Sequence, residues 1–334
     1  MKKFIIITAL MLMCVLGGIV FLANDLWRYA HSASGADASP EIFTIRSGQG
    51  LDAIAQLLHQ ANMIEYPFKY KLIVQLRGEA QKLKAGEYLI SASMTPLEIL
   101  DKIVRGDVHL FKLTVPEGYN LHQIAALVGV AGLASEDAFY KAATNPAEVR
   151  RQNIDASTFE GYLFPETYYF PSQITPVQII TRMVKQFRAV FTDEMQQRAQ
   201  EMNLSIHQVV TLASIIEKET GAAEERAVIS SVFHNRLKKR MRLESDPTVI
   251  YGLKSFDGNL TRKHLKTLTP YNTYLIKGLP PGPIANPGRE AIRAVLYPDD
   301  TRFLFFVSKK DSTHYFSTNL KSHNRAVRKY QKIK

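Results

Sequence analysis

The chain has 334 residues, of which 46% are hydrophobic and 22% are charged. These fractions exclude an intrinsically disordered chain, and the length allows about two or three domains. The formal net charge of +11 is scattered, with clusters only at 236–242 and 325–334, so we interpret it as solvated or polyanion-facing surface and expect no nucleic-acid partner.

The N-terminus begins with an apolar segment. After Lys2 and Lys3, residues 4–23 carry no charge, which is the length that a helix needs to cross a bilayer. A cleavable signal peptide is the alternative, but it has a shorter apolar region and a clear cleavage site. The positive-inside rule places residues 1–3 in the cytoplasm and the rest of the chain outside. The sole cysteine, Cys14, lies inside the span, so we expect no intramolecular disulfide.

Residues 24–41 have linker composition, and they include the small, polar stretch HSASGADASP.

Two later segments repeat one pattern. Residues 43–64 and 113–134 each read as a short β-type run, a Gly-containing turn and a helix. The matching positions are Thr44, Gly48, Leu51, Ile54, Ala55 and Leu57 in the first copy and Thr114, Gly118, Leu121, Ile124, Ala125 and Leu127 in the second. Two small α/β units or one duplicated module are predicted, since two copies are too few for a solenoid.

The first copy resembles a LysM module, the small strand-helix-helix-strand domain that binds glycans containing N-acetylglucosamine. The motifs that carry the resemblance are IRSGQGLDAIAQLL and the closing KAGEYLI at 84–90. The resemblance implies a LysM-like module at 42–108, and a generic α/β spacer is the alternative.

From residue 159 onward, aromatic and Pro/Gly-rich loops alternate with helices. The stretch FEGYLFPETYYF, at 159–170, combines aromatic rings with carboxyl groups, a mixture that suits the apolar faces and hydroxyl edges of a sugar. Glu160, Tyr162 and Tyr168 are therefore candidate substrate-binding residues, with an aromatic core segment as the alternative. Within 270–288, Pro280, Pro281, Pro283 and Pro287 exclude a regular helix or central strand, so we expect an ordered loop that forms a wall or lid beside a cleft.

Several chemistries are excluded by their missing motifs. The sequence has no H-E-x-x-H, G-x-S-x-G, S-x-x-K, G-x-x-x-x-G-K-[ST] or G-x-G-x-x-G motif. Its nine histidines show no close ligand spacing, so we expect no metal and no cofactor. Of the chemistries considered, acid–base catalysis by carboxyl groups is the one that remains.

One glutamate follows a run of apolar residues. In TLASIIEKETG, at 211–221, Glu217 comes directly after Ile215 and Ile216. A poorly solvated carboxyl group keeps its proton more readily, which suits a general acid. At about 100° per residue, Glu217 shares a face with small residues, so we expect an open groove above it, with Glu219 on nearly the opposite face. The alternative is that Glu217 points to water from an ordinary amphipathic helix.

Four longer stretches follow one another in the order LASIIEKETG, SVFHNRLKKRMRLESDPTVIYGL, YNTYLIKGLPPGPIANPG and THYFSTNLKSHN. Behind a single anchor and a LysM-like module, they resemble the YceG-like (MltG) family of endolytic murein transglycosylases over nearly the whole chain. The resemblance implies an inner-membrane protein that faces the periplasm and cuts the bond between N-acetylmuramic acid and N-acetylglucosamine within peptidoglycan strands. It also implies that Glu217 is the catalytic residue and that the chain trims or terminates nascent strands, and we hypothesise that it associates with penicillin-binding peptidoglycan synthases.

The mechanism follows from this activity. A hydrolase generally needs two carboxyl groups, whereas a lytic transglycosylase needs one, because the muramyl 6-hydroxyl is the nucleophile and a 1,6-anhydro ring results. The alternatives are a hydrolase in which Glu160 or Asp246 is the partner of Glu217, and a non-catalytic glycan-binding anchor. The further candidates for positioning the substrate are Asn235, Arg236, Ser245, Asp246, Tyr271, Asn272, Tyr274 and Asn319.

The predicted fold class is α+β. We expect a transmembrane helix at 4–23, a small LysM-like α/β module at 42–108 and a larger mixed α+β catalytic region at 109–334, with its core at about 156–330. The expected partners are peptidoglycan glycan strands, the inner membrane and, as a hypothesis, the penicillin-binding synthases.

Overall fold

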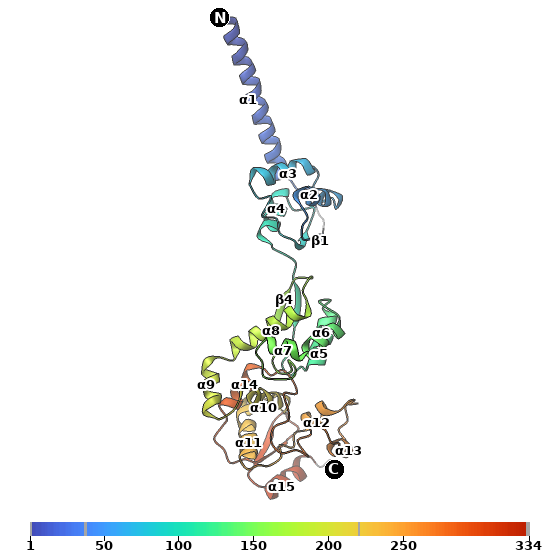
Figure 1. Cartoon of the computed structure of the whole chain (residues 1–334), viewed down its shortest axis with the longest axis vertical. Helices are drawn as coiled ribbons and strands as arrows, with labels where there is room; N and C mark the ends of the chain where they lie inside the picture. Colours follow the sequence, from blue (N-terminus) through green and yellow to red (C-terminus); the bar gives the residue numbers. More distant parts are fainter. Residues whose placement is uncertain (1, 37–38, 220, 332–334) are drawn as a thin grey trace. The chain divides into compact units, whose positions relative to one another are not determined.

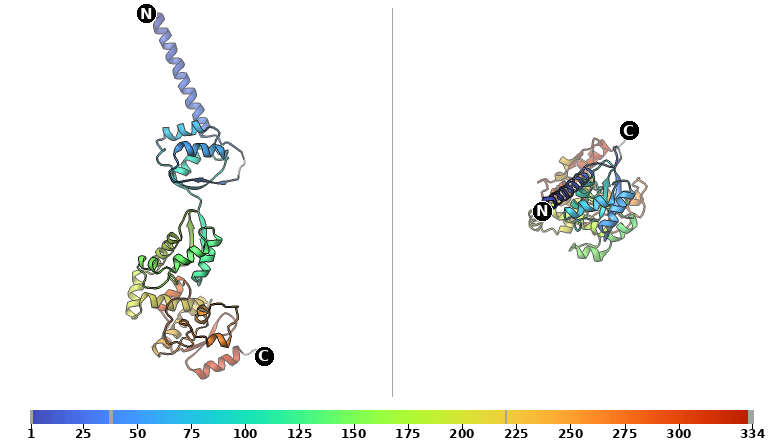
Figure 2. Two further views of the ribbon diagram at one scale, coloured as in Figure 1. Left: turned by 45° about the vertical axis from the view of Figure 1, so that its right-hand side comes forward. Right: turned by 90° about the horizontal axis from the view of Figure 1, so that it is seen from above.

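The chain folds into two compact units. The computed structural model describes residues 2–36, 39–219 and 221–331. One unit comprises Met1–Phe111 with Pro171–Gln173, and the other comprises Lys112–Phe170 with Ile174–Lys334. Helices dominate and the strands are short (Figures 1 and 2), so the mixed α+β class predicted from the sequence is confirmed.

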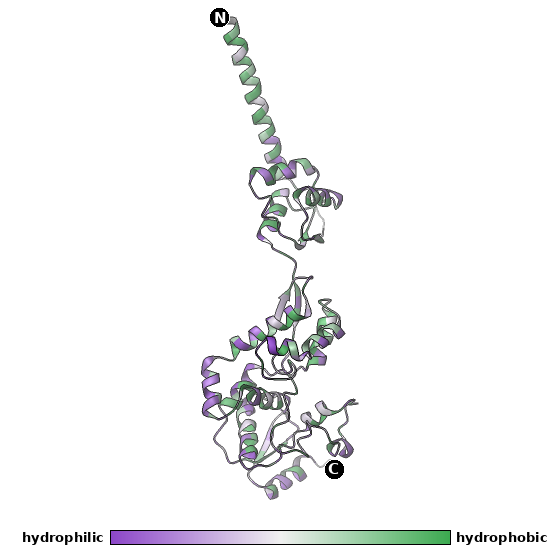
Figure 3. Ribbon diagram, viewed as in Figure 1, coloured by the Kyte–Doolittle hydropathy of each residue, from purple (hydrophilic) through white to green (hydrophobic). Residues whose placement is uncertain are grey.

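The first element, α1 (Lys2–Ala30), is a continuous helix of 29 residues. Among the described residues it is the one helix that is long and apolar enough to cross a membrane, over Phe4–Ala30. Its apolar residues extend along most of its length (Figure 3). The helix continues past residue 23, through part of the segment that we expected to be a linker, because Tyr29 and Ala30 pack into the core of the first unit.

The first unit encloses its own core between one two-stranded antiparallel sheet and three helices. Its elements are β1 (Glu41–Ile45), α2 (Leu51–Gln60), α3 (Pro67–Leu76), β2 (Gly86–Ile90) and α4 (Pro96–Arg105). β1 and β2 pair antiparallel, with Phe43 opposite Tyr88, and both side chains are buried. The order strand, helix, helix, strand holds for the first four elements, and the identification as a LysM-like module stays a prediction.

The second unit contains most of the helices and two small two-stranded sheets. β3 pairs with β4 in one sheet, and β5 pairs with β6 in the other. Its elements in chain order are β3 (Phe111–Thr114), α5 (Leu121–Val130), α6 (Glu136–Ala143), α7 (Pro146–Arg151), β4 (Thr167–Phe170), α8 (Pro176–Val190), α9 (Asp193–Glu201), α10 (Ile206–Glu219), η1 (Ala223–Glu225), α11 (Arg226–Lys238), α12 (Asp246–Gly252), α13 (Arg262–Leu265), α14 (Arg289–Leu296), β5 (Phe305–Ser308), β6 (His314–Ser317) and α15 (Leu320–Tyr330).

The repeated sequence pattern gives the same local structure twice. β1 and α2 are joined by a turn at Gly48, and β3 and α5 by a turn at Gly118. Both glycines have positive φ, 85° and 76°, a conformation that other residues adopt only with strain. The predicted strand, turn and helix are therefore confirmed in both copies.

α10 is the central helix of the second unit. Ser205 and Gln208 each accept a hydrogen bond from the other's backbone N–H, which starts the helix with a capping box. Residues 209–216 are all buried, as in a helix that is covered on every side. α9, α11, α12 and α14 pack against α10, so the side chains of its last turn are surrounded by other segments.

Candidate active site

The last turn of α10 carries two glutamates, Glu217 and Glu219, that face different surroundings. The Oε2 atom of Glu217 accepts a hydrogen bond of 3.0 Å from the backbone N–H of Gly288, directly before α14. Its Oε1 atom lies 3.5 Å from Nη2 of Arg226, and only 6% of its side chain is exposed. Glu217 therefore joins the end of α10 to the starts of α11 and α14.

The open groove that we expected above Glu217 is filled at Val210 and Ser214, whereas a side chain added at Gly221 would meet open space, so the groove beside Glu217 itself stays a prediction. The proline-rich segment covers the small-residue face of α10, where the Oγ atom of Ser214 accepts a hydrogen bond of 3.0 Å from the N–H of Ile284. A side chain at Gly161 would collide with Val210 of α10 and with Pro283. At Val210 and Ser214 the small residues of this face admit the loop.

The proline-rich loop itself has the character that its sequence predicts. No helix or strand is assigned within residues 270–288, and residues 282–288 are buried. The ring of His207 contacts the carbonyl oxygen of Pro281 through Nε2 at 2.9 Å. The loop is ordered and packs along α10, and its role as a wall or lid beside a cleft stays a prediction.

Glu219 lines a cavity of about 390 Å³, which we call the Glu219 cavity. Its polar lining residues are Glu219, Arg236, Glu244, Asp246, Tyr274, His323 and Asn324, and its apolar ones are Leu243, Phe305, Phe306 and Leu320. The pKa of Glu219 is raised from 4.5 to about 7, mainly because burial desolvates the carboxyl group; the hydrogen bond from Ser245 and the charge of Arg236 lower it, and the charge of Asp246 raises it. A carboxyl group with this pKa is protonated in a substantial fraction of molecules at neutral pH.

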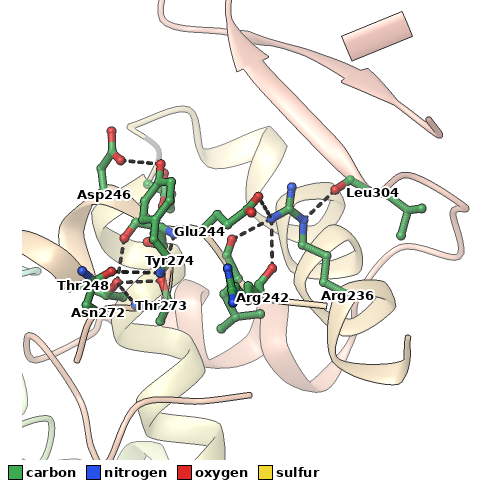
Figure 4. A network of polar contacts seen from close by, with 12 residues as sticks. Arg236, Arg242, Glu244, Asp246, Thr248, Asn272, Thr273, Tyr274 and Leu304 are labelled. Atoms are coloured by element: carbon green, nitrogen blue, oxygen red, sulfur yellow. Dashed lines mark hydrogen bonds and ion pairs between the residues drawn. The ribbon is translucent and has the colours of Figure 1, made fainter. Parts of the chain in front are cut away.

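Two carboxyl groups of the cavity, those of Glu219 and Asp246, each accept a hydrogen bond from a hydroxyl group. The Oγ atom of Ser245 donates a hydrogen bond to Oε1 of Glu219. Asp246 is the first residue of α12, and its Oδ1 atom accepts a hydrogen bond of 2.7 Å from the hydroxyl of Tyr274. Figure 4 shows this contact beside the hydroxyl network of Thr248 and Thr273.

Arg236 supplies a fixed positive charge to the same cavity. Its Nε donates to the carbonyl oxygen of Leu304 at 2.7 Å, and its Nη1 donates to the carbonyl oxygens of Arg242 and Leu243 and to Oε2 of Glu244 at 3.0 Å (Figure 4). Arg236 is buried, its Nε and Nη1 donors are directed at these acceptors, and its charge lowers the pKa of Glu219.

A buried loop supports Tyr274. The Nδ2 atom of Asn272 donates to the carbonyl oxygens of Leu265 and Thr267, and its Oδ1 atom accepts from the backbone N–H of Tyr274. Asn272 is fully buried. It shapes the loop and does not line the Glu219 cavity.

The aromatic stretch at 159–170 lies inside the fold, as its core alternative predicts. Glu160 is 4% exposed and accepts hydrogen bonds from the hydroxyl of Tyr251, Nδ2 of Asn286 and the N–H of Leu121. Burial raises the pKa of Glu160 to about 7. The hydroxyls of Tyr162 and Tyr168 contact Nδ1 of His207 and the carbonyl oxygen of Phe164, respectively. That these residues bind substrate stays a prediction.

Three further sequence candidates lie apart from the carboxyl groups of the cavity. Asn235 donates from Nδ2 to the carbonyl oxygens of Thr301 and Phe303. Tyr271 packs its ring on that of Tyr251. Asn319 caps α15, because its side chain accepts a hydrogen bond from the N–H of Ser322.

Sequence reasoning missed His323 as a site residue. It lines the Glu219 cavity, its ring stacks on Phe305, and its buried Nδ1 atom has no hydrogen-bond partner among the described residues. Burial and the charge of Arg236 lower the pKa of His323, so the ring is neutral at neutral pH. The only signal was its position in THYFSTNLKSHN, four residues after Asn319.

Three comparisons with known proteins find YceG-like proteins or endolytic murein transglycosylases. Residues 43–329 match the YceG-like family. An endolytic murein transglycosylase of Bacillus subtilis (strain 168) is 36% identical over 305 residues, which cover 86% of this chain and 83% of that protein. An endolytic murein transglycosylase of Streptococcus pneumoniae serotype 2 is 27% identical over 319 residues, and the match covers 85% of this chain but 57% of that protein. The crystal structure of a yceG-like protein from Listeria monocytogenes superposes with a TM-score of 0.61 at 33% identity, covering 87% of this chain and 100% of that one.

Proposed function

This chain belongs to the YceG-like family, and from that premise we propose that it is a peptidoglycan lytic transglycosylase that cuts within glycan strands. The observation that supports this activity in the geometry is the Glu219 cavity, where a carboxyl group with a pKa of about 7 faces a space of about 390 Å³. Such a group suits the protonation of a leaving glycosidic oxygen near neutral pH.

We propose Glu219 as the general acid. Glu217 accepts the N–H of Gly288 and lies 3.5 Å from Nη2 of Arg226, so both of its carboxyl oxygens are engaged by neighbouring segments. Glu219 receives one hydroxyl hydrogen bond, and it lines a cavity of about 390 Å³. The role of Glu217 as the acid, which the family resemblance implied, stays a prediction, since catalytic contacts can form only when substrate binds.

The proposed reaction needs one carboxyl group and no water. Protonated Glu219 gives its proton to the glycosidic oxygen as the bond from C1 of N-acetylmuramic acid breaks. The resulting carboxylate then takes the proton of the muramyl 6-hydroxyl as that oxygen bonds to C1, which restores the acid and leaves a 1,6-anhydro end. Phe305, Phe306 and Leu320 provide apolar walls that keep water scarce beside C1.

Product mass tests this proposal. Glycan strands incubated with the full-length chain should give fragments that end in 1,6-anhydro-N-acetylmuramic acid, lighter by one water than hydrolysis products. Reducing ends would indicate a hydrolase, and uncut strands that remain bound would indicate a glycan-binding anchor. Either result would reject the lytic reaction.

A hydrolase is the second candidate, because Asp246 places another carboxyl group in the Glu219 cavity. Asp246→Asn distinguishes the two reactions. In a hydrolase it removes the second catalytic carboxyl group and abolishes cleavage. In the lytic reaction it removes a charge that raises the pKa of Glu219, so anhydro products persist and the fall of the rate with rising pH begins at a lower pH.

We further propose that α1 anchors the chain in the inner membrane with the two folded units in the periplasm, where it terminates nascent strands beside penicillin-binding synthases. The apolar span Phe4–Ala30 supports the anchor, and an external position puts the cavity on the side of its substrate. Protease added to spheroplasts should remove both units, whereas protection of these units would reject the orientation. Crosslinking in intact cells that captured no synthase, under conditions that capture known synthase partners, would reject the association.

A further inference from the structure

A second cavity beside the Glu219 cavity is lined by basic side chains. It has a volume of about 760 Å³, and we call it the basic cavity; its lining residues are Asn235, Lys238, Lys239, Arg302, Leu304 and Thr318. Three of the six are cations and none is an acid. Lys238, Lys239 and Arg302 are exposed and have neither an ion pair nor a side-chain hydrogen bond among the described residues. A cavity lined by one sign of charge concentrates ligands of the opposite sign.

The basic cavity and the Glu219 cavity share a wall. Asn235 and Arg236 are consecutive on α11, and the first lines the basic cavity while the second lines the Glu219 cavity. Leu304 lines the basic cavity, and its carbonyl oxygen accepts the Nε hydrogen bond of Arg236 at 2.7 Å. Phe305, the next residue, lines the Glu219 cavity. A polymer that enters one cavity therefore passes close to the other.

The sequence brings these cations together from two segments that are far apart. Lys238 and Lys239 belong to the basic cluster at 236–242, and Arg302 precedes β5. The amide of Asn235 fixes the second segment to α11 through the carbonyl oxygens of Thr301 and Phe303, at 2.9 and 3.0 Å. Arg302 lies between these two anchored residues, so its backbone is held at the rim of the basic cavity.

We propose that the basic cavity binds carboxylates of the peptides that branch from the glycan strand while Glu219 acts on the strand itself. This inference rests on the proposed function, because these peptides are attached to the N-acetylmuramic acid units whose bonds are cut. The peptides are acidic and extend sideways from the strand, which matches a basic cavity beside the cavity that takes the sugar. A volume of about 760 Å³ is on the scale of a peptide-sized ligand and exceeds what a single phosphate fills.

The variant that tests this site is the triple change Lys238→Gln, Lys239→Gln and Arg302→Gln in the full-length chain. Its matched control is the triple change Arg182→Gln, Lys185→Gln and Lys254→Gln, which removes the same charge from exposed positions outside the basic cavity. All six side chains are exposed, so both variants should keep the melting temperature of the unsubstituted chain within a few degrees.

Binding is measured with three fluorescent glycan strands: strands with intact peptides, the same strands after an amidase has removed the peptides, and peptide-free strands with a diphosphate at the end. The triple variant should bind strands with peptides about tenfold more weakly, because three cation–carboxylate contacts are lost. It should bind both peptide-free strands as the unsubstituted chain does. Added salt should weaken the binding of peptide-bearing strands less in the triple variant than in the control.

Four outcomes would overturn the proposal: no loss of binding, an equal loss on peptide-free strands, an equal loss in the control variant, or a loss confined to strands with the diphosphate. The last would assign the basic cavity to the phosphate groups of a lipid-linked strand end. Because binding is read without cleavage, the result stands even if the chain cuts no strand, so failure of the proposed reaction and failure of this site are separate results.

Discussion

The two sides of the last turn of α10 differ in what covers them. On one side, Glu217 is enclosed by Arg226, Gly288 and the turn at Gly118, where an added side chain would lie 3.5 Å from its Cγ atom. On the other side, Glu219 faces a cavity. Two residues of the same type, two positions apart, thus have different surroundings: Glu217 joins neighbouring segments, and Glu219 lines a cavity.

This difference shows how a fold separates support from reaction. The Glu217 side joins three segments through the contacts of Glu217 with Arg226 and Gly288, which fixes the direction of the helix end. The Glu219 side combines desolvation with a neighbouring carboxylate, and both raise the pKa of Glu219. The predictions below test whether the two sides have these separate roles.

The largest effect is expected on cleavage by Glu219→Gln. The amide keeps the size of the side chain and cannot donate the proton, so the rate should fall by roughly 100- to 10,000-fold. Glu217→Gln is the matched control, and its rate should stay within about tenfold of the unsubstituted chain. The two rates are measured on the same glycan strands by counting anhydro ends. The opposite ranking would restore Glu217 as the acid.

Ser245→Ala should have a smaller effect with a distinctive pH signature. The unsubstituted rate should fall as pH rises through about 7, since Glu219 must be protonated to act. The Ser245 hydroxyl hydrogen bond lowers the pKa of Glu219, so its removal should move this fall to higher pH. The maximal rate should drop several-fold, because the carboxyl group is positioned less well. A profile that only decreases in height, with no shift along the pH axis, would contradict the role of Glu219.

The sequence predicts the elements of the site better than it predicts the site. Apolar spacing, the two Gly turns and the prolines of 270–288 are local signals, and the structure has the helices, turns and loop that they indicate. The helical period also places Glu217 and Glu219 on different faces. It does not reveal which face is covered, because Ile284 and Gly288, which cover the Glu217 side, are about seventy residues further along the chain. That choice is made by tertiary packing.

The same limit applies to the cavities. The cluster at 236–242 is visible in the sequence as charge, but the cavity that it lines needs Arg302 and Thr318 from another part of the chain. His323 reaches the Glu219 cavity from α15. Distant residues that meet in one cavity leave no spacing signal in a single sequence.

Glu219→Gln and Glu217→Gln should change the stability of the folded chain at pH 8 in opposite directions. The pKa of Glu219 in the folded chain, about 7, lies above its ordinary 4.5. Ionisation therefore costs the folded state nothing below about pH 4, and the cost grows between 4.5 and 7 by up to about 1.4 kcal/mol per pKa unit. Glu219→Gln should raise the melting temperature at pH 8 and leave it unchanged at pH 4. Glu217→Gln should lower the free energy of unfolding at pH 8 by about 1 kcal/mol, since it weakens the contact with Arg226.

Thermal unfolding of both variants at pH 4 and pH 8 is the measurement, with the full-length chain as the reference. If Glu219→Gln destabilised the chain at pH 8, Glu219 would be a paired, ionised structural carboxylate. The proposal that it is the general acid would then lose its physical basis.

The smallest effect is expected from Gly118→Ala, compared with Gly48→Ala at the equivalent turn of the first copy. Both positions have positive φ, so each change should cost about 1 kcal/mol of stability. The methyl group at Gly48 meets open space, whereas at Gly118 it makes ordinary contact with Cγ of Glu217 and with Lys218. Because this contact lies on the supporting side of α10, cleavage should change by less than about twofold in either variant. Rates and melting temperatures of the pair decide the point: a large loss of cleavage in Gly118→Ala alone, with equal loss of stability in both, would show that the Glu217 side takes part in the reaction.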